Sequence, residues 1–250
     1  MTATKSGSWT RTVSLIAFML LWQLAAMAVN DAILPSPVVV FKNLWIHLTK
    51  HDLLLHLGIT LYRVAVAFII AMAVGTLIGL LMGQWRGVDA TLDSLLVLAL
   101  NIPALVTIIL CYIWFGLTEV AAILAVAINK IPTVVVTIRE GARAVDRELL
   151  QVAQAFRLKP LKTLRQIYLP QLYPYLMASA RSGLALIWKI VLVVELLGRS
   201  NGVGFQLGTF FQFFDIVGIL VYTIAFASII LVIEAVLMRP LDRYISRWRT

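Results

Sequence analysis

The sequence predicts an all-α integral membrane protein. Of its 250 residues, 61% are hydrophobic and only 13% are charged, and the mean hydropathy is +0.94. A soluble domain has too little interior to bury that much apolar surface. The apolar residues also gather in runs about as long as the roughly 20 residues that cross a bilayer as a helix. We therefore expect a body of about six transmembrane helices.

The predicted spans are residues 12–30, 58–82, 92–115, 119–138, 173–197 and 216–238. The first follows Lys5 and Arg11, as the apolar core of a signal peptide would, but the run is long and ends without a clear small-x-small cleavage site. We predict an uncleaved first helix. The third and fourth spans nearly touch, and "WFGLTE" (114–119) is expected to be a tight turn between them.

A long outer segment, residues 31–57, joins the first two spans. Pro35 and Pro37 in "ILPSP" disfavour helix at its start, and residues 38–56 are expected to form an amphipathic helix near the membrane surface. His47 and His51 lie one helical turn apart in this helix. Because no third ligand accompanies them, we predict surface histidines and no metal site. The single Cys111 cannot form an internal disulfide.

Basic residues predict which side each loop faces, because cytoplasmic loops carry an excess of Lys and Arg. With the N-terminus inside, the outer segments hold only Lys42, Lys50 and Arg199. The inner segments hold Lys5, Arg11, Arg86, Arg139, Arg143, Arg147, Arg157, Lys159, Lys162, Arg165, Arg239, Arg243, Arg247 and Arg249. Both termini are therefore expected in the cytoplasm, and the net charge of +9 marks that side of the membrane rather than a nucleic-acid partner.

Four glycines recur every fourth residue along the second span and just beyond it: Gly75, Gly79, Gly83 and Gly87. They leave one helix face without side chains, so that another helix can approach closely. Packing inside one subunit is favoured over a dimer interface.

The longest inner loop, about 139–172, contains a short amphipathic helix. Asp146 is a good N-cap for a helix that starts at Arg147. Its apolar residues fall at i, i+3, i+4 and i+7 and form one stripe: Leu149, Val152, Ala153 and Phe156. Pro160 is expected to break the helix, and a second short helix, residues 161–168, is expected to end at Leu169-Pro170. From composition alone, this segment can lie on lipid, fold back on its own chain or dock into a partner.

Charged residues inside spans are costly and often functional. Four are candidates for a solute path: Lys130, Arg181, Lys189 and Glu195. Lys130 and Lys189 can attract an anion, and they can equally neutralise Glu195. Arg63, Arg181 and Glu234 are expected to form structural ion pairs or to reach the membrane interface.

The inner loop resembles the coupling segment of the permease subunits of bacterial ABC importers. That family's pattern is Glu-Ala-Ala, three residues, Gly, nine residues, Ile, one residue, Leu-Pro. This chain has Ala153, Ile167, Leu169 and Pro170 at matching positions. It departs from the pattern at three positions: Gln151, Val152 and Arg157. If the family's Gly has a left-handed backbone conformation, Arg157 in the same conformation would destabilise the turn by about 1–2 kcal/mol. We expect instead that the turn is built differently here, with another backbone conformation.

Further stretches resemble the nitrate/sulfonate/taurine branch of that family over nearly the whole chain. They are "ILPSPVVVFKNL" (33–44), "HLGITLYRVAVAF" (56–68), "GTLIGLLMG" (75–83), "NIPALVTIILCYIWFGLTE" (101–119), "VDRELLQVAQAF" (145–156), "VVELLGRSNGVG" (193–204) and "LDRYISRW" (241–248).

The resemblance implies a type I ABC importer permease fold with a cytoplasmic coupling helix, in a bacterial inner membrane. It implies a first helix with an outer segment (1–57), a permease core (58–238) with the coupling segment 139–172, and a basic tail (239–250). It also implies a second permease subunit, which we expect to be identical, two cytoplasmic ATPases that use ATP and Mg, and an extracytoplasmic binding protein. The residues implied in ATPase coupling are Glu148, Leu149, Gln151, Val152, Ala153, Phe156, Arg157, Leu169 and Pro170.

This chain lacks a G-x-x-x-x-G-K-[ST] motif and is expected to bind no cofactor and to catalyse no reaction itself. Its expected solute is small and anionic, like a sulfonate, taurine or nitrate. The Gly-rich loop "GRSNGVGFQLG" (198–208) is expected to be either a flexible turn or an outer gate that touches the binding protein, with Asn201, Gly202 and Gly204 as its residues.

Two other classes of membrane protein predict different features. A self-contained secondary carrier or channel predicts a relay of membrane acids or an inverted internal repeat, and no such repeat is visible. A membrane enzyme needs clustered His, Asp and Glu or a nucleophile with its base, and three histidines in or beside one outer segment do not supply these. The importer permease is the prediction, and the secondary carrier is its alternative.

Overall fold

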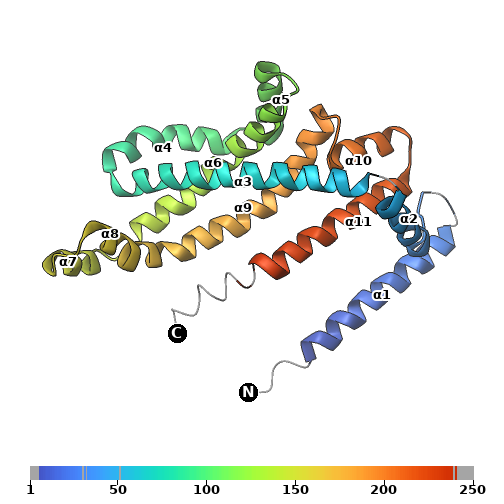
Figure 1. Ribbon diagram of the computed structural model, residues 1–250, viewed down its shortest axis with the longest axis horizontal. Coiled ribbons are helices and arrows are strands. Elements are labelled where there is room, and N and C mark those ends of the chain that lie inside the picture. The colour runs from blue at the N-terminus through green and yellow to red at the C-terminus, as the bar shows by residue number, and fades with distance from the viewer. Residues whose placement is uncertain (1–5, 30, 32, 51, 239, 241–250) are drawn as a thin grey trace.

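The computed structural model describes residues 6–29, 31, 33–50, 52–238 and 240, and the secondary structure within them is helical, without a strand. The all-α prediction is therefore confirmed for this part of the chain. Figure 1 shows the arrangement, with α3 across the middle of the body and α7 and α8 at one end. The helices are α1 (Ser6–Val29), α2 (Pro37–Lys50), α3 (Leu53–Gln84), α4 (Arg86–Asn101), α5 (Ala104–Phe115), α6 (Glu119–Arg143), α7 (Arg147–Ala155), α8 (Pro160–Thr163), the π-helix η1 (Leu164–Tyr168), α9 (Leu169–Gly198), α10 (Val203–Gln212), α11 (Ile216–Ile233) and the π-helix η2 (Glu234–Met238).

The predicted glycine stripe is the seam between α3 and α6, the two helices that contact each other most extensively. Three of its members pack on α6: Gly75, Gly79 and Gly83. A Cβ on Gly79 would lie only 2.8 Å from Cβ of Ile138, which is inside van der Waals contact. Gly87 has open space instead. The glycines therefore pack within one subunit as predicted, except at Gly87, which lies beyond the seam in α4.

Three helices of the described chain are long and apolar enough to cross a membrane alone: α3, α6 and α11 counted to Val236. They correspond to the predicted second, fourth and sixth spans. The predicted first span is a shorter apolar run, Val13–Val29, within α1. The fifth lies in α9, whose 30 residues include Arg181, Lys189 and Glu195 and are therefore less apolar. The length of α9 still suffices, at 1.5 Å per residue, to cross a bilayer.

The predicted third span, 92–115, is wrong as a single straight helix. The chain forms α4 and α5 instead, and the two helices meet at an angle of 97°. Ile102 and Pro103 between them both have extended backbone conformations. The residue before a proline is driven out of the helical region, so the break falls where the sequence places Pro103.

The outer segment also differs from its prediction in its boundaries. Its helix α2 ends at Lys50, and α3 begins at Leu53, earlier than the predicted residue 58. The indole of Trp22 in α1 donates a hydrogen bond of 3.1 Å to the carbonyl of Pro35, which anchors the start of this segment to the first helix.

The central core gathers side chains from α3, α5, α6, α9, α10 and α11. A second, smaller cluster lies between the ends of α3 and α6 and the helix α4, around Met82, Leu96 and Val135. The body therefore has its main core toward α10. Its other end carries the segment of α7 and α8 (Figure 1).

Candidate functional site

The helix α7 begins where the sequence predicts. Asp146 accepts hydrogen bonds from the backbone N–H of Glu148 at 2.8 Å and of Leu149 at 3.4 Å. A capping carboxylate satisfies N–H groups that have no partner within the helix. The backbone N–H of Asp146 is in turn bonded to the side chain of Gln171 in α9, at 2.8 Å. The start of α7 is thus tied directly to a long helix of the membrane body.

The end of α7 corrects the prediction for Arg157. This residue has φ +50°, in the left-handed region. Its N–H bonds the carbonyl of Gln154 at 2.9 Å, and the N–H of Leu158 bonds the carbonyl of Ala153 at 3.0 Å. These two bonds form the Schellman motif, which normally places glycine where Arg157 stands. The turn therefore keeps the glycine geometry, and the expectation that it is built differently is wrong.

The chain after this turn also differs from the prediction. Pro160 starts α8 as expected, but Leu169-Pro170 does not end the second helix. The backbone stays helical from α8 through η1 into α9. In η1 the N–H of Leu169 reaches back five residues to the carbonyl of Leu164, a π-type bond. Pro170 has no N–H to donate, and the wider turn just before it accommodates the ring without breaking the helix.

The apolar stripe of α7 is largely open to its surroundings. Leu149, Val152 and Phe156 are 46%, 50% and 76% exposed, whereas Ala153 is 1% exposed. A nine-residue helix that exposes three apolar side chains has not buried its own hydrophobic face. Since its two ends are held by the cap at Asp146 and the turn at Arg157, this face is presented on a fixed support.

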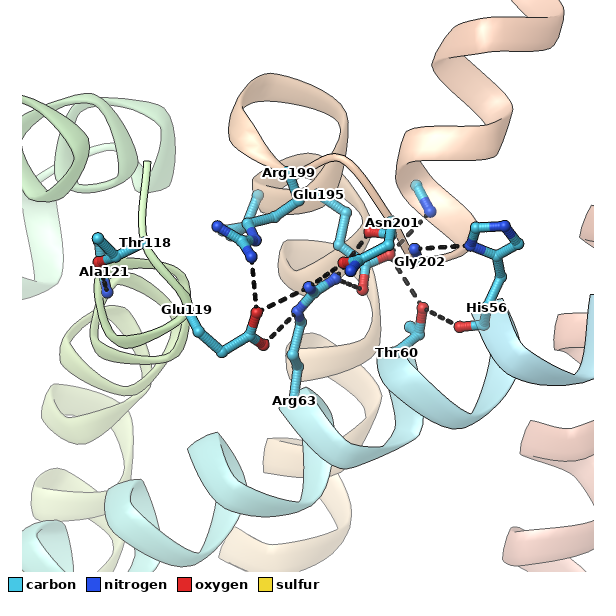
Figure 2. A network of polar contacts seen from close by, with 12 residues as sticks. His56, Thr60, Arg63, Thr118, Glu119, Ala121, Glu195, Arg199, Asn201 and Gly202 are labelled. Atoms are coloured by element: carbon cyan, nitrogen blue, oxygen red, sulfur yellow. Dashed lines mark hydrogen bonds and ion pairs between the residues drawn. The ribbon is translucent and has the colours of Figure 1, made fainter. Parts of the chain in front are cut away.

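The second site is polar and lies at the end of the body opposite α7. It is centred on Arg63 of α3 (Figure 2). Its guanidinium, 1% exposed, binds both carboxylate oxygens of Glu119 at the start of α6, at 2.6 and 2.9 Å. It also binds Glu195 of α9 at 2.7 Å. The predicted structural ion pair of Arg63 is therefore present, and the alternative that it reaches the interface is wrong.

Glu195 is completely buried and accepts two further hydrogen bonds. They come from the hydroxyl of Thr60 at 3.0 Å and from the N–H of Gly204 at 2.8 Å. The expectation that Lys130 or Lys189 neutralises Glu195 is therefore wrong. Arg63 neutralises it from α3, and a buried carboxylate needs such a partner because desolvation is costly.

The predicted outer-gate loop is fastened to this network. Arg63 donates to the carbonyl of Asn201 at 2.9 Å and to its side-chain oxygen. Gly202 has φ +104°, and a Cβ there would overlap the carboxylate of Glu195. A side chain would also strain the backbone at this φ. The loop is thus a fixed turn that sits on an ion pair, not a freely flexible one.

The sequence reasoning missed three members of this network: His56, Thr60 and Glu119. The ring of His56 accepts from the N–H of Gly202 at 3.0 Å, and the hydroxyl of Thr60 accepts from the N–H of Val203 at 2.8 Å. His56, Thr60 and Arg63 lie at i, i+4 and i+7 on α3, which puts them on one helix face. That polar stripe in an apolar span is the signal that could have found them.

Arg199 adds a second cation to the same end. It binds Glu119 at 2.9 Å and also donates to the carbonyl of Leu117. The site therefore joins two arginines to two glutamates, from α3, α6, α9 and the loop after α9. The four formal charges sum to zero, so this network is built to hold helices together.

One further charge of the predicted path, Arg181, forms an ion pair. Arg181 of α9 lies 2.6 Å from Glu234 at the start of η2, so the ion-pair interpretation of Glu234 is confirmed. Arg239, the other partner considered for Glu234, lies outside the described residues.

The two lysines behave differently from the arginines. Lys130 is 2% exposed in the middle of α6, and its stem lies over Gly183 of α9, where a Cβ would come within 3.0 Å of Cε. Lys189 is on the exposed side of α9. Within the described part of the chain, neither ammonium forms an ion pair. The acids of the predicted spans, Asp93, Glu119, Glu195 and Glu234, are all held by arginines.

No group of three or more His, Cys, Asp or Glu side chains among the described residues is placed to hold a metal ion. His47 packs edge-on against Phe210 and Tyr222. His51, the other histidine of the pair noted in the sequence, lies outside the described residues.

The part of the chain that the structure describes is helical, includes helices of membrane length and exposes an amphipathic helix at one end, as a membrane transport subunit would. The chain belongs to the family of binding-protein-dependent transport system inner membrane components, which matches residues 72–249. It is therefore an ABC transport permease of the inner membrane, and the resemblance to the nitrate/sulfonate/taurine branch is confirmed.

Its relatives include a protein of Bacillus subtilis named aliphatic sulfonates transport permease protein SsuC, with 30% identity over 98% of this chain and 90% of that protein. The nitrate import permease protein NrtB of Synechococcus elongatus is 24% identical over 77% of this chain and 73% of its own length. The taurine transport system permease protein TauC of Escherichia coli is 26% identical over 77% of this chain and 70% of its own length.

The fold is also that of a solved transporter. An inward-facing structure of the MetNI methionine ABC transporter superposes with a TM-score of 0.65 at 16% identity, over 78% of this chain and 95% of that one. At this identity the similarity concerns the fold alone. It supports the predicted type I importer permease architecture.

Proposed function

We propose that this chain is the membrane subunit of an ATP-driven importer. With a second copy it would form the path for a small anionic solute that an extracytoplasmic binding protein delivers. Two separate ATPases would dock at α7 and supply the energy from ATP and Mg. The N-terminus, the loop that contains α7, and the basic tail would then face the cytoplasm, in accordance with the distribution of Lys and Arg.

The observation that carries this proposal is the open apolar face of α7. Three apolar side chains on a helix held at both ends fit the groove of a partner protein, which recognises an amphipathic helix through anchors at i, i+3 and i+7. The sequence has no phosphate-binding motif of its own, so the energy must come from that partner. Rigid ends allow a movement of the partner to reach α6 and α9 directly.

The anionic character of the solute rests on the two lysines. All four acids of the predicted spans, Asp93 included, are held by arginines, which leaves Lys130 and Lys189 as cations without a counter-charge among the described residues. An uncompensated cation inside a membrane is costly, and such a residue is therefore often functional. The names of the relatives refer to sulfonates, nitrate and taurine. A path role for Arg181 and Glu195 would require their ion pairs to open, so we assign solute contact to the lysines.

The outer gate is proposed at the loop that carries Asn201, Gly202 and Gly204. Because Arg63 and Glu195 fix this loop to α3 and α9, it can move only with these helices. A binding protein that contacts the loop would thus act on the helices that form the path.

The experiment is purification of the tagged full chain from its own host in mild detergent, followed by mass spectrometry and by uptake assays in vesicles. An ATPase with a Walker motif that accompanies the chain at about one copy per permease, together with uptake that needs ATP, is the expected result. A chain that is isolated alone and moves solute without ATP would support the alternative, a self-contained secondary carrier.

A further inference from the structure

A cavity of about 550 Å³ opens between the ends of α3 and α6 and the starts of α4 and α7. It is lined by Met82, Gly83, Gln84, Arg86, Asp89, Arg143 and Arg147. This volume is in the range of sites for small ligands. The cavity is lined by the last turn of α3, far along this helix from Arg63. Figure 1 shows this end of α3 on the side of the body where α7 lies.

The lining of the cavity is strongly basic. Three of its residues are arginines and one is an acid, Asp89, which is already held by Arg143 and by Arg139. Arg86 and Arg147 have no ion pair or side-chain hydrogen bond to any described residue. Two guanidinium groups that share a cavity without a counter-charge repel each other and are suited to bind an anion with several oxygens.

The position of the cavity at the end of an apolar helix indicates which kind of molecule carries that anion. Met82, near the end of the apolar helix α3, is 1% exposed. Trp85, three residues further along the chain, is 57% exposed. Tryptophan is enriched at the membrane–water interface, where lipid headgroups lie. A cavity that begins at the last apolar turn and ends among arginines therefore spans the headgroup region.

The backbone leaves room for such a group beside Arg86. Trp85 precedes α4 without a side chain that caps the helix, so the first N–H groups of this 16-residue helix lack a side-chain acceptor. A Cβ on Gly87 would meet nothing within 4 Å. These features supply N–H donors and space beside the two arginines, on which the proposed site rests.

We propose that this cavity binds the phosphate of an anionic phospholipid headgroup, with Arg86 and Arg147 as its principal ligands. Basic pockets between transmembrane helices at the cytoplasmic face bind such headgroups. The proposal is independent of the importer function, because it concerns binding of lipid by the chain itself.

The position of the site connects it to α7. Arg147 is the first residue of α7, and the amide of Gln84, in the wall of the cavity, donates to the hydroxyl of Tyr168 in η1 at 3.0 Å. A bound headgroup would thus join the end of α3 to both sides of the segment that carries the exposed apolar face. Anionic lipid is therefore expected to restrict the movement of this segment.

The test uses the full-length chain in detergent and native mass spectrometry, with phosphatidylglycerol and phosphatidylcholine as probes. The wild-type chain is expected to retain phosphatidylglycerol in preference to phosphatidylcholine. The double variant Arg86→Gln/Arg147→Gln is expected to bind it about 10- to 30-fold more weakly. The matched control is Lys162→Gln/Arg165→Gln, which removes the same amount of charge from the loop that contains Arg147 but outside the cavity, and is expected to leave binding unchanged.

Three results would overturn the proposal. Equal losses in the control pair would show general attraction of lipid to a basic surface. Equal retention of both lipids by the wild-type chain would show that no headgroup site exists. Binding of inorganic phosphate with the same dependence on Arg86 and Arg147, without preference for phosphatidylglycerol, would assign the site to a soluble anion instead.

Discussion

The guanidinium of Arg63 lies 2.7 Å from the carboxylate of Glu195, and the two side chains are 1% and 0% exposed. This pair joins α3 to α9 beneath the loop that carries Asn201. It lies in an apolar body, where an unpaired charge is costly. The network around it therefore determines how the helices meet at the end of the molecule opposite α7.

Glu195→Gln is expected to destabilise the fold by about 3–5 kcal/mol, because it removes one member of a buried pair and leaves excess positive charge on Arg63 and Arg199. The measurement is the free energy of unfolding in detergent. Arg181→Gln is the control: it removes an ion pair from a half-exposed arginine, and its expected cost is within about 1 kcal/mol. Equal losses for the two variants would show that the Arg63 network is not a special support.

Arg157→Gly is expected to stabilise the protein by about 1 kcal/mol, because glycine adopts φ +50° without the clash of a Cβ. Arg157→Ala keeps the Cβ and removes the same charge, so it should give no such gain. Thermal unfolding of the three chains separates backbone strain from charge. A gain of the same size for alanine would attribute the effect to charge.

Gly79→Ala is expected to destabilise the fold by about 1–3 kcal/mol, because the added methyl would overlap Ile138 across the seam between α3 and α6. Gly58 lies on the same helix with nothing within 4 Å of its Cβ position. Gly58→Ala should therefore be neutral or stabilising, by up to about 1 kcal/mol. Comparison of the two unfolding free energies tests whether the seam depends on bare backbone.

Lys130→Met is expected to raise stability and to lower solute uptake. The variant removes a buried ammonium that has no ion pair within the described residues. We expect its removal to raise the free energy of unfolding by about 1–3 kcal/mol. If the ammonium contacts the anion, uptake falls at the same time. Lys42→Met, on the exposed side of α2, should change neither quantity. Unchanged uptake in Lys130→Met would remove this lysine from the solute path.

Much of the fold could be predicted because apolar runs and glycine spacing are local features. The stripe from Gly75 to Gly83 predicted a close helix contact, and its partner in the structure is α6. Asp146 predicted the start of α7. The break at Ile102 and Pro103 was present in the sequence too. It was missed because α4 and α5 together have the length and apolarity of one span.

The polar network could not be predicted in the same way, because its partners are far apart in the chain. Arg63 and Glu195 are separated by 132 positions, and only the packing of α3 on α9 brings them together. Both lysines lie nearer to Glu195 in the sequence than Arg63 does, which led to the wrong partner. Arg157 was misjudged because residue preference argued against a backbone conformation that the Schellman turn requires.

We propose that α7 docks a separate ATPase through its exposed apolar face. The most direct measurement is the amount of ATPase that accompanies the tagged chain from native membranes, for the wild type and for Val152→Glu/Phe156→Asp. The control is Phe213→Asp, a similarly exposed aromatic at the opposite end of the molecule. We expect the ATPase to be lost from the α7 variant and retained in the control, with both chains folded and in the membrane. Full retention by the α7 variant would contradict it.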